Sequence, residues 1–344
     1  MPKIVLSGLL PEEIFTQLSL PQKFRAEQIF KWISKGVKSF SEMTNISKDL
    51  QESLSQIALI RSSKIGTVLK DPDGTIKLQI ILQDEYAVET VLLTDKEGRK
   101  TACVSCQVGC AMKCAFCQTG TLGLARNLTA GEIVEQFLYL EEVSGPLDNI
   151  VFMGMGEPMQ NLGGIRKALE ILCSPKGRNL SKKRITLSTS GIIKGIYDLA
   201  DNGPNIRLAV SLTTATEDLR KQLMPVTNGN PLSELKKAIK YYAEKSGKRV
   251  TLEAALLSQK NTDKESAKKM IDFTNGLDVN INLIPWNPIS TLPFTEPSQT
   301  ECNFFISELK KAGLNVTLRT KRGRKIGGAC GQLGKSIKNK NQNQ

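Results

Sequence analysis

The stretch Cys110-Ala111-Met112-Lys113-Cys114-Ala115-Phe116-Cys117 places three cysteines within eight residues. Thiolates bind iron and zinc tightly, but three of them complete only three corners of a tetrahedral shell. A cubane iron–sulfur cluster held by three cysteines leaves one iron with an open position, which the amine and carboxylate of an external amino acid can occupy. We therefore predict that Cys110, Cys114 and Cys117 hold a 4Fe-4S cluster.

A zinc site and a group of purely structural thiols are the alternatives for this stretch. Zinc usually takes four ligands, as cysteine pairs or with histidines, and the chain contains no histidine. Cys106 could supply the fourth ligand, but the resulting gaps of three, three and two residues are not a familiar zinc spacing. Three thiols within eight residues also exceed what packing requires.

The composition is typical of a globular protein. The 344 residues are 40% hydrophobic and 24% charged, enough for one large core and a small accessory module. No apolar run approaches the roughly 18 residues of a membrane helix, and the first residues lack the apolar stretch of a secretory signal. We expect a cytoplasmic protein with no membrane partner, whose eight cysteines serve metal or redox chemistry.

The net charge of +13 lies entirely in the later part of the chain. Residues 1–90 carry 11 basic and 11 acidic side chains, so the excess begins after them. A basic catalytic portion favours a polyanionic partner, most often nucleic acid. Solubility alone is the other explanation for this charge.

The hydrophobic pattern divides the chain into four predicted parts. Residues 1–60 form an N-terminal helical accessory domain of three short helices, the third over Ser39 to Leu54. Residues 61–104 form a strand-rich connector, in which Asp71-Pro72-Asp73-Gly74 is the turn of an antiparallel hairpin. Residues 105–334 form the catalytic core, and residues 335–344 are a polar tail that we expect to be disordered.

The core alternates strands and helices. Thr129 and Glu132 make a capping box at the start of the first core helix. Alternation of this kind indicates parallel strands with crossover helices, and six units are too few for a closed eight-stranded barrel. We predict an α/β fold, a partial (β/α)6 barrel with a β-hairpin extension, with strands over 148–153, 184–189, 206–212, 249–257, 279–284 and 314–319 and helices over 129–143, 161–173, 193–202, 232–246, 263–275 and 298–312.

Polar motifs follow successive predicted strands. Gly154-Met155-Gly156-Glu157-Pro158 places a carboxylate between glycines, which let a ligand approach the backbone closely. Ser188-Thr189-Ser190-Gly191, Ser211-Leu212-Thr213 and Trp286-Asn287-Pro288 end later strands. Each motif alone is an ordinary turn, but together they place hydroxyls and an amide around the entrance of one predicted binding site.

A basic run leads to a cysteine flanked by small residues near the end of the chain. Residues 319–325 carry five cations, and Cys330 follows in the stretch Gly327-Gly328-Ala329-Cys330-Gly331-Gln332. Five cations bind phosphates readily, and the glycines give Cys330 an exposed, mobile position. A solvated basic loop is the alternative.

Taken together, the ordered motifs resemble those of the radical S-adenosylmethionine (SAM) RNA adenosine methyltransferases. Glu157-Pro158 and Ser188-Thr189-Ser190-Gly191 are more similar to the C2-methylating type (RlmN) than to the C8-methylating type (Cfr). The resemblance covers nearly the whole chain, through Phe24-Arg25-Ala26, Val88-Glu89-Thr90-Val91, Cys103-Val104-Ser105, Gln107-Val108-Gly109-Cys110, Leu223-Met224-Pro225, Asn282-Leu283-Ile284-Pro285-Trp286 and Ala329-Cys330-Gly331-Gln332-Leu333.

The resemblance implies methylation of C2 of an adenosine in 23S rRNA, with tRNA as a further candidate substrate. Adenine C2 is electron-poor, so an electrophilic methyl group cannot be transferred to it directly. In the family, the cysteine matching Cys330 takes a methyl group from one SAM, and a second SAM yields a radical that activates this methyl group. The cysteine matching Cys103 then forms a disulfide that releases the product, and the position of Glu89 matches the proton acceptor.

The same resemblance implies a 4Fe-4S cluster and SAM as cofactors, RNA and an electron donor such as flavodoxin as partners, and a monomer. The positions that match SAM contacts are Gly156, Glu157, Ser188, Ser211, Leu212, Thr213 and Asn287. Thr213 stands where the family usually has histidine, and Cys106 where it usually has serine. The alternatives are methylation at C8 or at another RNA adenosine position, and a non-catalytic iron–sulfur factor that binds RNA.

Overall fold

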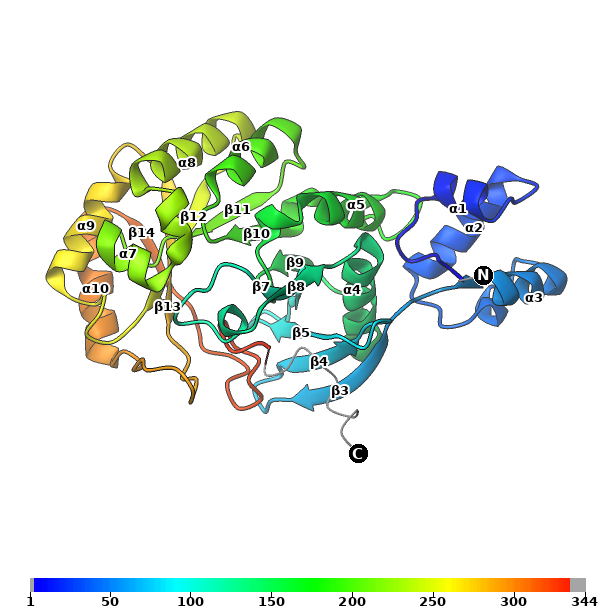
Figure 1. Ribbon diagram of the computed structural model, residues 1–344, viewed down its shortest axis with the longest axis horizontal. Helices are drawn as coiled ribbons and strands as arrows, with labels where there is room; N and C mark the ends of the chain where they lie inside the picture. Colours follow the sequence, from blue (N-terminus) through cyan, green and yellow to red (C-terminus); the bar gives the residue numbers. More distant parts are fainter. Residues whose placement is uncertain (1–2, 335–344) are drawn as a thin grey trace.

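The computed structural model describes residues 3–334, so the predicted tail over 335–344 lies outside the described residues. The N-terminal module contains α1 (Pro11–Gln17), α2 (Lys23–Ser34) and α3 (Lys48–Ile57). Its two ends are joined by a short parallel pair, β1 (Ile4–Val5) with β2 (Ala58–Leu59). Figure 1 shows these three helices at one end of the molecule.

The third predicted helix is divided in the structure. A single turn of 3-10 helix over Phe40–Glu42 comes first, and α3 begins only at Lys48. After Met43 the intervening residues Thr44 to Ser47 are polar or β-branched, and Ser47 has the extended backbone of a helix N-cap. The prediction of one helix from Ser39 to Leu54 was therefore wrong in its first half.

One ten-stranded sheet organises the rest of the molecule. Its order is β14-β13-β12-β11-β10-β9-β6-β5-β4-β3, parallel from β14 to β6 and antiparallel from β6 to β3. The antiparallel strands are β3 (Lys64–Lys70), β4 (Ile76–Ile81) and β5 (Ala87–Thr94), and the parallel strands are β6 (Lys100–Cys103), β9 (Asn149–Phe152), β10 (Ile185–Thr189), β11 (Arg207–Ser211), β12 (Val250–Leu256), β13 (Val279–Pro285) and β14 (Asn315–Leu318).

Crossover helices connect the parallel strands and pack against each other in neighbouring pairs, α4 with α5, α6 with α8, and α9 with α10. The helices are α4 (Ala130–Ser144), α5 (Leu162–Cys173), α6 (Ile193–Asn202), α7 (Glu217–Leu223), α8 (Leu232–Ser246), α9 (Lys264–Thr274) and α10 (Gln299–Lys311). Figure 1 shows α9 and α10 at the end of the molecule opposite the N-terminal module. The predicted partial barrel and its hairpin extension are confirmed.

The structure also contains helices and strands that were not predicted, which are β1, β2, β6, α7, β7 and β8. Strand β6 adds a seventh parallel strand beside β9, and α7 precedes α8. A separate two-stranded hairpin, β7 (Gln107–Cys110) with β8 (Gly123–Asn127), encloses the cysteine stretch. Strands β6, β7 and β8 are short, and β8 is mostly exposed, so none of the three carries a strong alternating apolar pattern.

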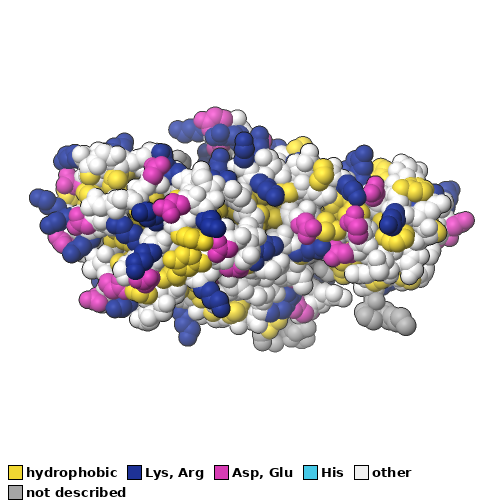
Figure 2. All heavy atoms as spheres, turned by 90° about the horizontal axis from the view of Figure 1, so that it is seen from above, with side chains coloured by type: hydrophobic (Ala, Val, Ile, Leu, Met, Phe, Trp, Pro, Cys, Tyr) yellow, Lys and Arg dark blue, Asp and Glu magenta, His cyan; other side chains and the backbone are white. Residues whose placement is uncertain are grey.

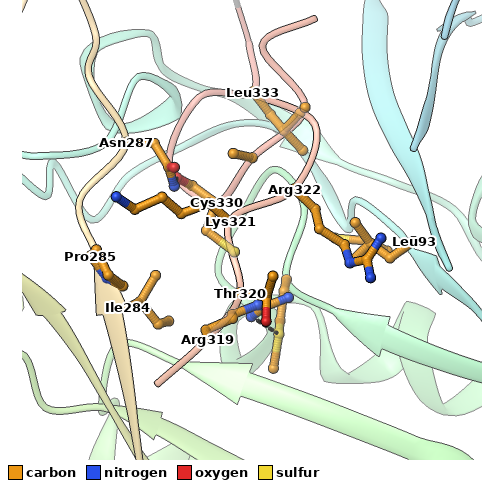
Figure 3. A pocket seen from close by; sticks show the side chains of 14 residues that line it. Leu93, Ile284, Pro285, Asn287, Arg319, Thr320, Lys321, Arg322, Cys330 and Leu333 are labelled. Atoms are coloured by element: carbon orange, nitrogen blue, oxygen red, sulfur yellow. Dashed lines mark hydrogen bonds between the residues drawn. The ribbon is translucent and has the colours of Figure 1, made fainter. Parts of the chain in front are cut away.

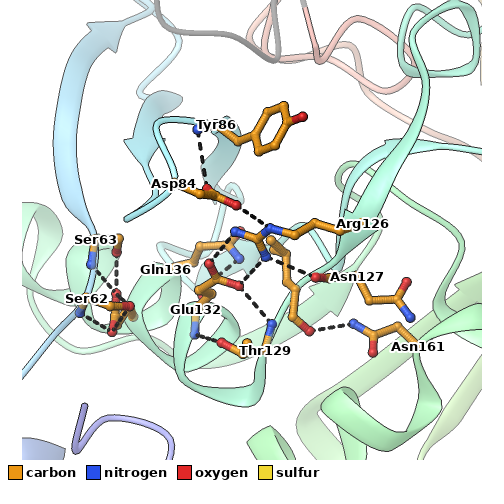
Figure 4. A network of polar contacts seen from close by, with 12 residues as sticks. Ser62, Ser63, Asp84, Tyr86, Arg126, Asn127, Thr129, Glu132, Gln136 and Asn161 are labelled. Atoms are coloured by element: carbon orange, nitrogen blue, oxygen red, sulfur yellow. Dashed lines mark hydrogen bonds and ion pairs between the residues drawn. The ribbon is translucent and has the colours of Figure 1, made fainter. Parts of the chain in front are cut away.

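A buried carboxylate joins the N-terminal module to the core. Glu135 on α4 accepts a hydrogen bond from Ser7 Oγ at 2.6 Å. It also accepts from the backbone nitrogens of Ser62 and Ser63 at 2.8 and 2.9 Å, and Figure 4 shows these two serines. Gly8 lies so close to α4 that a Cβ there would stand 3.0 Å from a backbone nitrogen of the helix. The module is thus fastened to the core by packed backbone as well as by hydrogen bonds.

A second polar group in Figure 4 fixes the hairpin that carries the cysteine stretch. Arg126 on β8 donates to Asp84 at 2.6 Å and to both carboxylate oxygens of Glu132 at 2.7 and 2.9 Å. These bonds raise the pKa of Arg126. The hairpin is thereby held to the first turn of α4 and to the turn between β4 and β5.

Over residues 3–334 no helix is long and apolar enough to cross a membrane.

Candidate active site

A cavity of about 180 Å³ lies where the parallel strands end. Its wall contains residues from the carboxyl ends of β9 to β14, together with the cysteine stretch and Cys330. Parallel strands bring their carboxyl ends to one edge, which explains why motifs far apart in sequence meet here. The predicted site residues that line this cavity are Cys110, Cys114, Cys117, Gly156, Glu157, Ser188, Ser211, Thr213, Asn287 and Cys330.

The cysteine stretch is held open as a loop by contacts with three other parts of the chain. Ala115 N donates to Leu223 O at 2.9 Å, and Trp286 Nε1 donates to Phe116 O at 2.8 Å. At the base of the loop, Gly109 has a φ of 79°, and a Cβ there would lie 1.9 Å from Gly123 O on β8. Only glycine allows the two strands to approach this closely.

The chemistry of the three thiols is suited to a cluster. Burial raises the pKa of Cys110 to about 12 and also raises the pKa values of Cys114 and Cys117. Buried thiols with raised pKa values stay neutral unless a metal replaces their protons. Within residues 3–334, no three His, Cys, Asp or Glu side chains are close enough to bind a single metal ion. A cubane places each thiolate on a different iron, so its ligands stand farther apart.

Cys106 does not belong to this group. Its side chain is buried and does not line the cavity, and its backbone carbonyl accepts from Leu128 N at 3.0 Å and from Asn161 Nδ2 at 2.8 Å. The four-cysteine zinc interpretation needs Cys106 beside the other three thiols. Its placement favours the three-cysteine cluster instead.

Glu157 is buried at the edge of the cavity, with 3% of its surface exposed. Its carboxylate accepts from Thr189 Oγ1 at 2.7 Å, Ser190 N at 2.8 Å and Met159 N at 3.0 Å. Burial raises the pKa of this carboxyl despite these donors, which act in the opposite direction. An ammonium group bound in the cavity would offset the cost of a buried negative charge.

Two buried polar atoms of the cavity wall make no hydrogen bond in the structure. They are Ser190 Oγ and Asn287 Oδ1. Buried polar atoms are normally paired, because leaving one unpaired costs about 1–3 kcal/mol. A bound molecule with hydroxyl and amine donors would satisfy both atoms, and SAM carries such groups on its ribose, adenine and amino acid parts. The residues present therefore suit SAM as well as the cluster.

Leu212 and Thr213 contribute backbone more than side chain. Both backbone nitrogens donate to Glu253 O, at 2.8 and 3.1 Å, and Leu212 does not line the cavity. Thr213 adopts a φ of 60°, unusual for a β-branched residue, and its carbonyl accepts from Asn261 Nδ2 at 2.9 Å. At this position the chain therefore supplies an ordered backbone to the cavity wall.

The sequence analysis missed two residues of the cavity region. Glu253 on β12 lines the cavity, accepts from Ser188 Oγ at 2.8 Å and lies 4.0 Å from Arg319. Arg220 on α7 is fully buried and donates to the carbonyls of Leu212 at 3.0 Å and Ser190 at 2.7 Å. Glu253 could have been noticed as a carboxylate inside an apolar strand, whereas Arg220 sits in an ordinary amphipathic pattern.

Cys103 and Cys330 line a second, adjoining cavity (Figure 3). Arg319 and Cys330 belong to the walls of both cavities. Burial raises the pKa of Cys103 to about 12, while the Arg319 guanidinium acts in the opposite direction. The pKa of Arg319 is raised, chiefly by Cys330. Arg319 therefore shares a cavity wall with both cysteines. All eight cysteines are free thiols in the structure, and the disulfide that the resemblance implies belongs to the reaction cycle.

Residues 319–334, which we call the C-terminal segment, lie across the mouth of these cavities. Gln118 N donates to Gly331 O at 2.7 Å, and Asn287 Nδ2 donates to Cys330 O at 3.2 Å. Part of the predicted phosphate-binding run is already paired, since Lys321 and Arg324 both bind Glu296. Figure 2 shows basic side chains spread along one face, with acidic ones among them.

Glu89 does not line either cavity. It is buried on β5, where its carboxylate lies 2.8 Å from Lys77 Nζ and accepts from Gly334 N at 2.6 Å. The predicted proton acceptor therefore faces the C-terminal segment rather than the cavity.

Comparisons with known proteins agree with this geometry. Residues 104–271 match the radical SAM superfamily, and residues 12–60 match the ribosomal RNA large subunit methyltransferase N-terminal domain. Proteins named probable dual-specificity RNA methyltransferase RlmN are 61% identical in Treponema denticola (99% of this chain, 98% of the relative) and 42% identical in Alkaliphilus oremlandii (94% of each). A radical SAM methyltransferase from Sphaerobacter thermophilus superimposes with a TM-score of 0.92 at 38% identity, covering 96% of this chain and 99% of that one.

The likeness extends over nearly the full length of both the chain and its relatives, and it includes the N-terminal module as well as the core. The alternative of a non-catalytic RNA-binding factor is therefore set aside. The chain belongs to the RlmN family of radical SAM RNA methyltransferases.

Proposed function

We propose that this enzyme methylates C2 of adenosine in 23S rRNA and in tRNA, with Cys330 as the carrier of the methyl group. The observation that carries the proposal is that Cys330 lines both cavities, one with the cluster cysteines and the other with Cys103. A carrier thiol must receive a methyl group at one place and release a product at another. The names of the relatives, which are called dual-specificity RNA methyltransferases, support the choice of substrates.

The electron-poor C2 carbon explains why a carrier is needed. It does not attack an electrophilic methyl group, so the methyl carbon must be made reactive first. When bound, the cluster and SAM would supply a methyl group and the radical that activates it. Cys110, Cys114 and Cys117 would hold the cluster, and the residues of the strand ends would hold SAM.

Within the cavity, we assign SAM binding to Gly156, Glu157, Ser188, Ser211, Leu212, Thr213 and Asn287. The Glu157 carboxylate would accept from the SAM amine, because its burial leaves it in need of a cation. Asn287 Oδ1 and Ser190 Oγ would receive donors that they lack in the structure. The backbone of Leu212 and Thr213 would shape the wall behind them.

The cysteine pair would carry out the transfer and the release. The Cys330 thiolate forms a bond to the methyl carbon of SAM as the carbon–sulfonium bond breaks. After the methyl carbon has bonded to the base, the Cys103 thiolate would attack the Cys330 sulfur. The bond between that sulfur and the methyl carbon would break, its electron pair would stay with the product, which takes up a proton, and a disulfide would form. Both steps need thiolates, and at Cys103 the Arg319 guanidinium acts against the burial that raises the pKa of this thiol.

Glu89 would accept the proton that the base loses.

The remaining assignments are RNA as the substrate, a reductant such as flavodoxin as the electron donor, and the cytoplasm as the location. The chain would act as a monomer, with the predicted domain boundaries at residues 60 and 104.

The test is mass spectrometry of nucleosides after reaction. Protein reconstituted with iron and sulfide is incubated with SAM, a reductant and either unmethylated 23S rRNA or tRNA. We expect 2-methyladenosine from both RNAs, and none from Cys330→Ala. Appearance of 8-methyladenosine, or of methylation at another position of the base, would contradict the proposal.

A further inference from the structure

The C-terminal segment is fastened to the hairpin of β3 and β4, about 250 residues earlier in the chain. In the turn of that hairpin, Asp73 Oδ2 accepts from Gly323 N at 2.7 Å and Asp71 Oδ2 accepts from Lys325 N at 3.1 Å. These bonds hold the start of the segment. They leave the stretch around Cys330 to be held by other groups.

Lys77 on β4 contacts that stretch directly. Its side chain is 4% exposed, and its Nζ donates to Gly327 O at 3.2 Å and lies 2.8 Å from Glu89 Oε1. The other carboxylate oxygen of Glu89 accepts from Gly334 N at 2.6 Å. A continuous series of contacts therefore runs from Gly327 through Lys77 and Glu89 to Gly334, and Cys330 lies between its two ends.

The ends of this stretch are suited to movement. Gly327 and Gly334 have φ values of 62° and 93°, and Gly331, next to Cys330, has a φ of 84°. Glycine reaches such values without the strain that a side chain would add. The stretch therefore depends on its contacts, more than on its backbone preferences, for its closed position.

Breaking the Lys77–Glu89 ion pair would also lower the stability of the fold. Both side chains are nearly buried, so removing one partner leaves an uncompensated charge in the interior. The ammonium of Lys77 has three donors and can serve the carboxylate and the carbonyl together. One residue thus connects the proposed proton acceptor with the segment that carries the proposed methyl carrier.

We propose that Lys77 is a positioning residue that holds Glu89 and the stretch 327–334 together, an arrangement that we call the clasp. The clasp keeps Cys330 in the cavity, and it keeps Glu89 outside the cavity, until the stretch lifts. The inference rests on the proposed function, in which Cys330 carries the methyl group and Glu89 accepts the proton. Lifting of the stretch removes the Gly334 hydrogen bond from Glu89 and uncovers its carboxylate, which stays beside Lys77, at the stage when Cys330 leaves the first cavity. Lys77 itself does not contact substrate.

The first test measures the clasp without any reaction. In the full-length reconstituted protein, amide hydrogen exchange of residues 327–334 and the rate of Cys330 alkylation by iodoacetamide are followed by mass spectrometry. Lys77→Met should raise both by about tenfold or more, the factor expected when charge-assisted hydrogen bonds are lost. Lys77→Arg should restore most of the protection, because it keeps the charge and the donors.

The matched control is Lys70→Met, an exposed lysine on the neighbouring strand β3. It should leave exchange and alkylation unchanged. If Lys77→Met misfolds because Glu89 is left unpaired, the double variant Lys77→Met/Glu89→Gln removes both charges, and it should show the same local loss of protection. Unchanged exchange at 327–334 in a folded variant, or an equal effect of Lys70→Met, would overturn the proposal.

The second test separates the clasp from the proposed function. In a single turnover, Lys77→Met should still methylate Cys330 but convert less of that methyl group into methylated adenosine, and Lys77→Arg should recover the conversion. If Lys77→Met converts methylated Cys330 as well as the unsubstituted protein does, the positioning role is wrong while the function stands. If the unsubstituted protein methylates no adenosine, the proposed function fails, and the exchange measurement still decides whether the clasp exists.

Discussion

Trp286 reaches across 170 residues of sequence to Phe116, where its Nε1 donates a 2.8 Å hydrogen bond to the backbone carbonyl of the cysteine stretch. The indole also packs with Leu223 and Met224, against which Cys114 lies. The loop that carries the cluster ligands is therefore supported by the end of β13. This contact holds the loop without using any of the three cysteine side chains.

We expect Trp286→Phe to keep the apolar packing but lose about 1 kcal/mol of stability with the hydrogen bond. The loosened loop should release its cluster faster in the presence of a chelator, which the visible absorbance reports. Trp32→Phe is the control, because Trp32 donates to Asn45 in the N-terminal module, far from the cluster in sequence and fold. Equal rates of cluster loss in both variants would show that the Trp286 contact does not support the loop.

The ligand assignment is tested by single cysteine substitutions. Cys110→Ala, Cys114→Ala and Cys117→Ala should each abolish the visible absorbance of the cluster, because three thiolates are the full protein ligand set that the proposal gives it. Cys106→Ser should keep it, since Cys106 does not line the cavity. Loss of absorbance in Cys106→Ser would return the four-cysteine interpretation.

The Cys103–Cys330 pair predicts a trapped intermediate. Cys103→Ala should still place the methyl carbon of Cys330 on RNA but be unable to release the product, since the attacking thiolate is missing. A protein–RNA adduct that resists denaturation and disappears with ribonuclease should accumulate on gels. Cys330→Ala should form none. Free turnover by Cys103→Ala would make Cys103 a structural residue.

The basic run offers a test of which cations contact RNA. Lys325 is exposed, whereas Lys321 is paired with Glu296. We expect Lys325→Ala to reduce the slope of log affinity against log salt by about 1, the contribution of one phosphate contact. Lys321→Ala should change it less, because Glu296 already neutralises that charge. The reverse order of the two slopes would place the phosphate contact on the paired residue.

Acid stability should depend on Glu301, in the first turn of α10. Burial alone would raise its pKa, but donors that include Ser298 N and Thr262 Oγ1 lower the pKa to about 2. A carboxyl with a lowered pKa stabilises the fold above its unfolded value near 4.5, and this contribution is lost as the pH falls from there towards 2. Urea unfolding of Glu301→Gln should show a deficit at pH 7 that shrinks below pH 4.5.

The control for this titration is Glu244→Gln, at an exposed position on α8. Its free energy of unfolding should follow that of the unsubstituted protein at every pH. A Glu301→Gln deficit that stays constant down to pH 2 would mean that lost packing, and not lost charge, explains the change.

Much of the fold could be read from local pattern. Thr129 and Glu132 predicted the start of α4, and the structure shows both bonds of the capping box, at 3.2 and 2.8 Å. Strong helical periodicity made the core helices accurate to within about a residue. Strand β7 was missed because it is four residues long and depends on Gly109 approaching β8, a contact that no local pattern records.

The candidate site divides in the same way. The cysteines and the strand-end motifs could be predicted, because spacing and topology bring them together whatever the side-chain details. The role of Arg319 could not, since the sequence groups it with an exposed basic run while the end of β14 turns it into the cavity. Lys77 was also missed, because its backbone partner Gly327 lies 250 residues away in the sequence.

The buried Glu135 joint has a consequence for what the enzyme can recognise. The N-terminal module is bonded to α4 through Ser7, and the start of the connector that follows it is bonded to the same carboxylate through Ser62 and Ser63. The span from the module to the cavity is therefore settled when the protein folds. An RNA that contacts both the module and the cavity must present its target base at that one separation. The enzyme would therefore select RNAs by the distance between these two contact points.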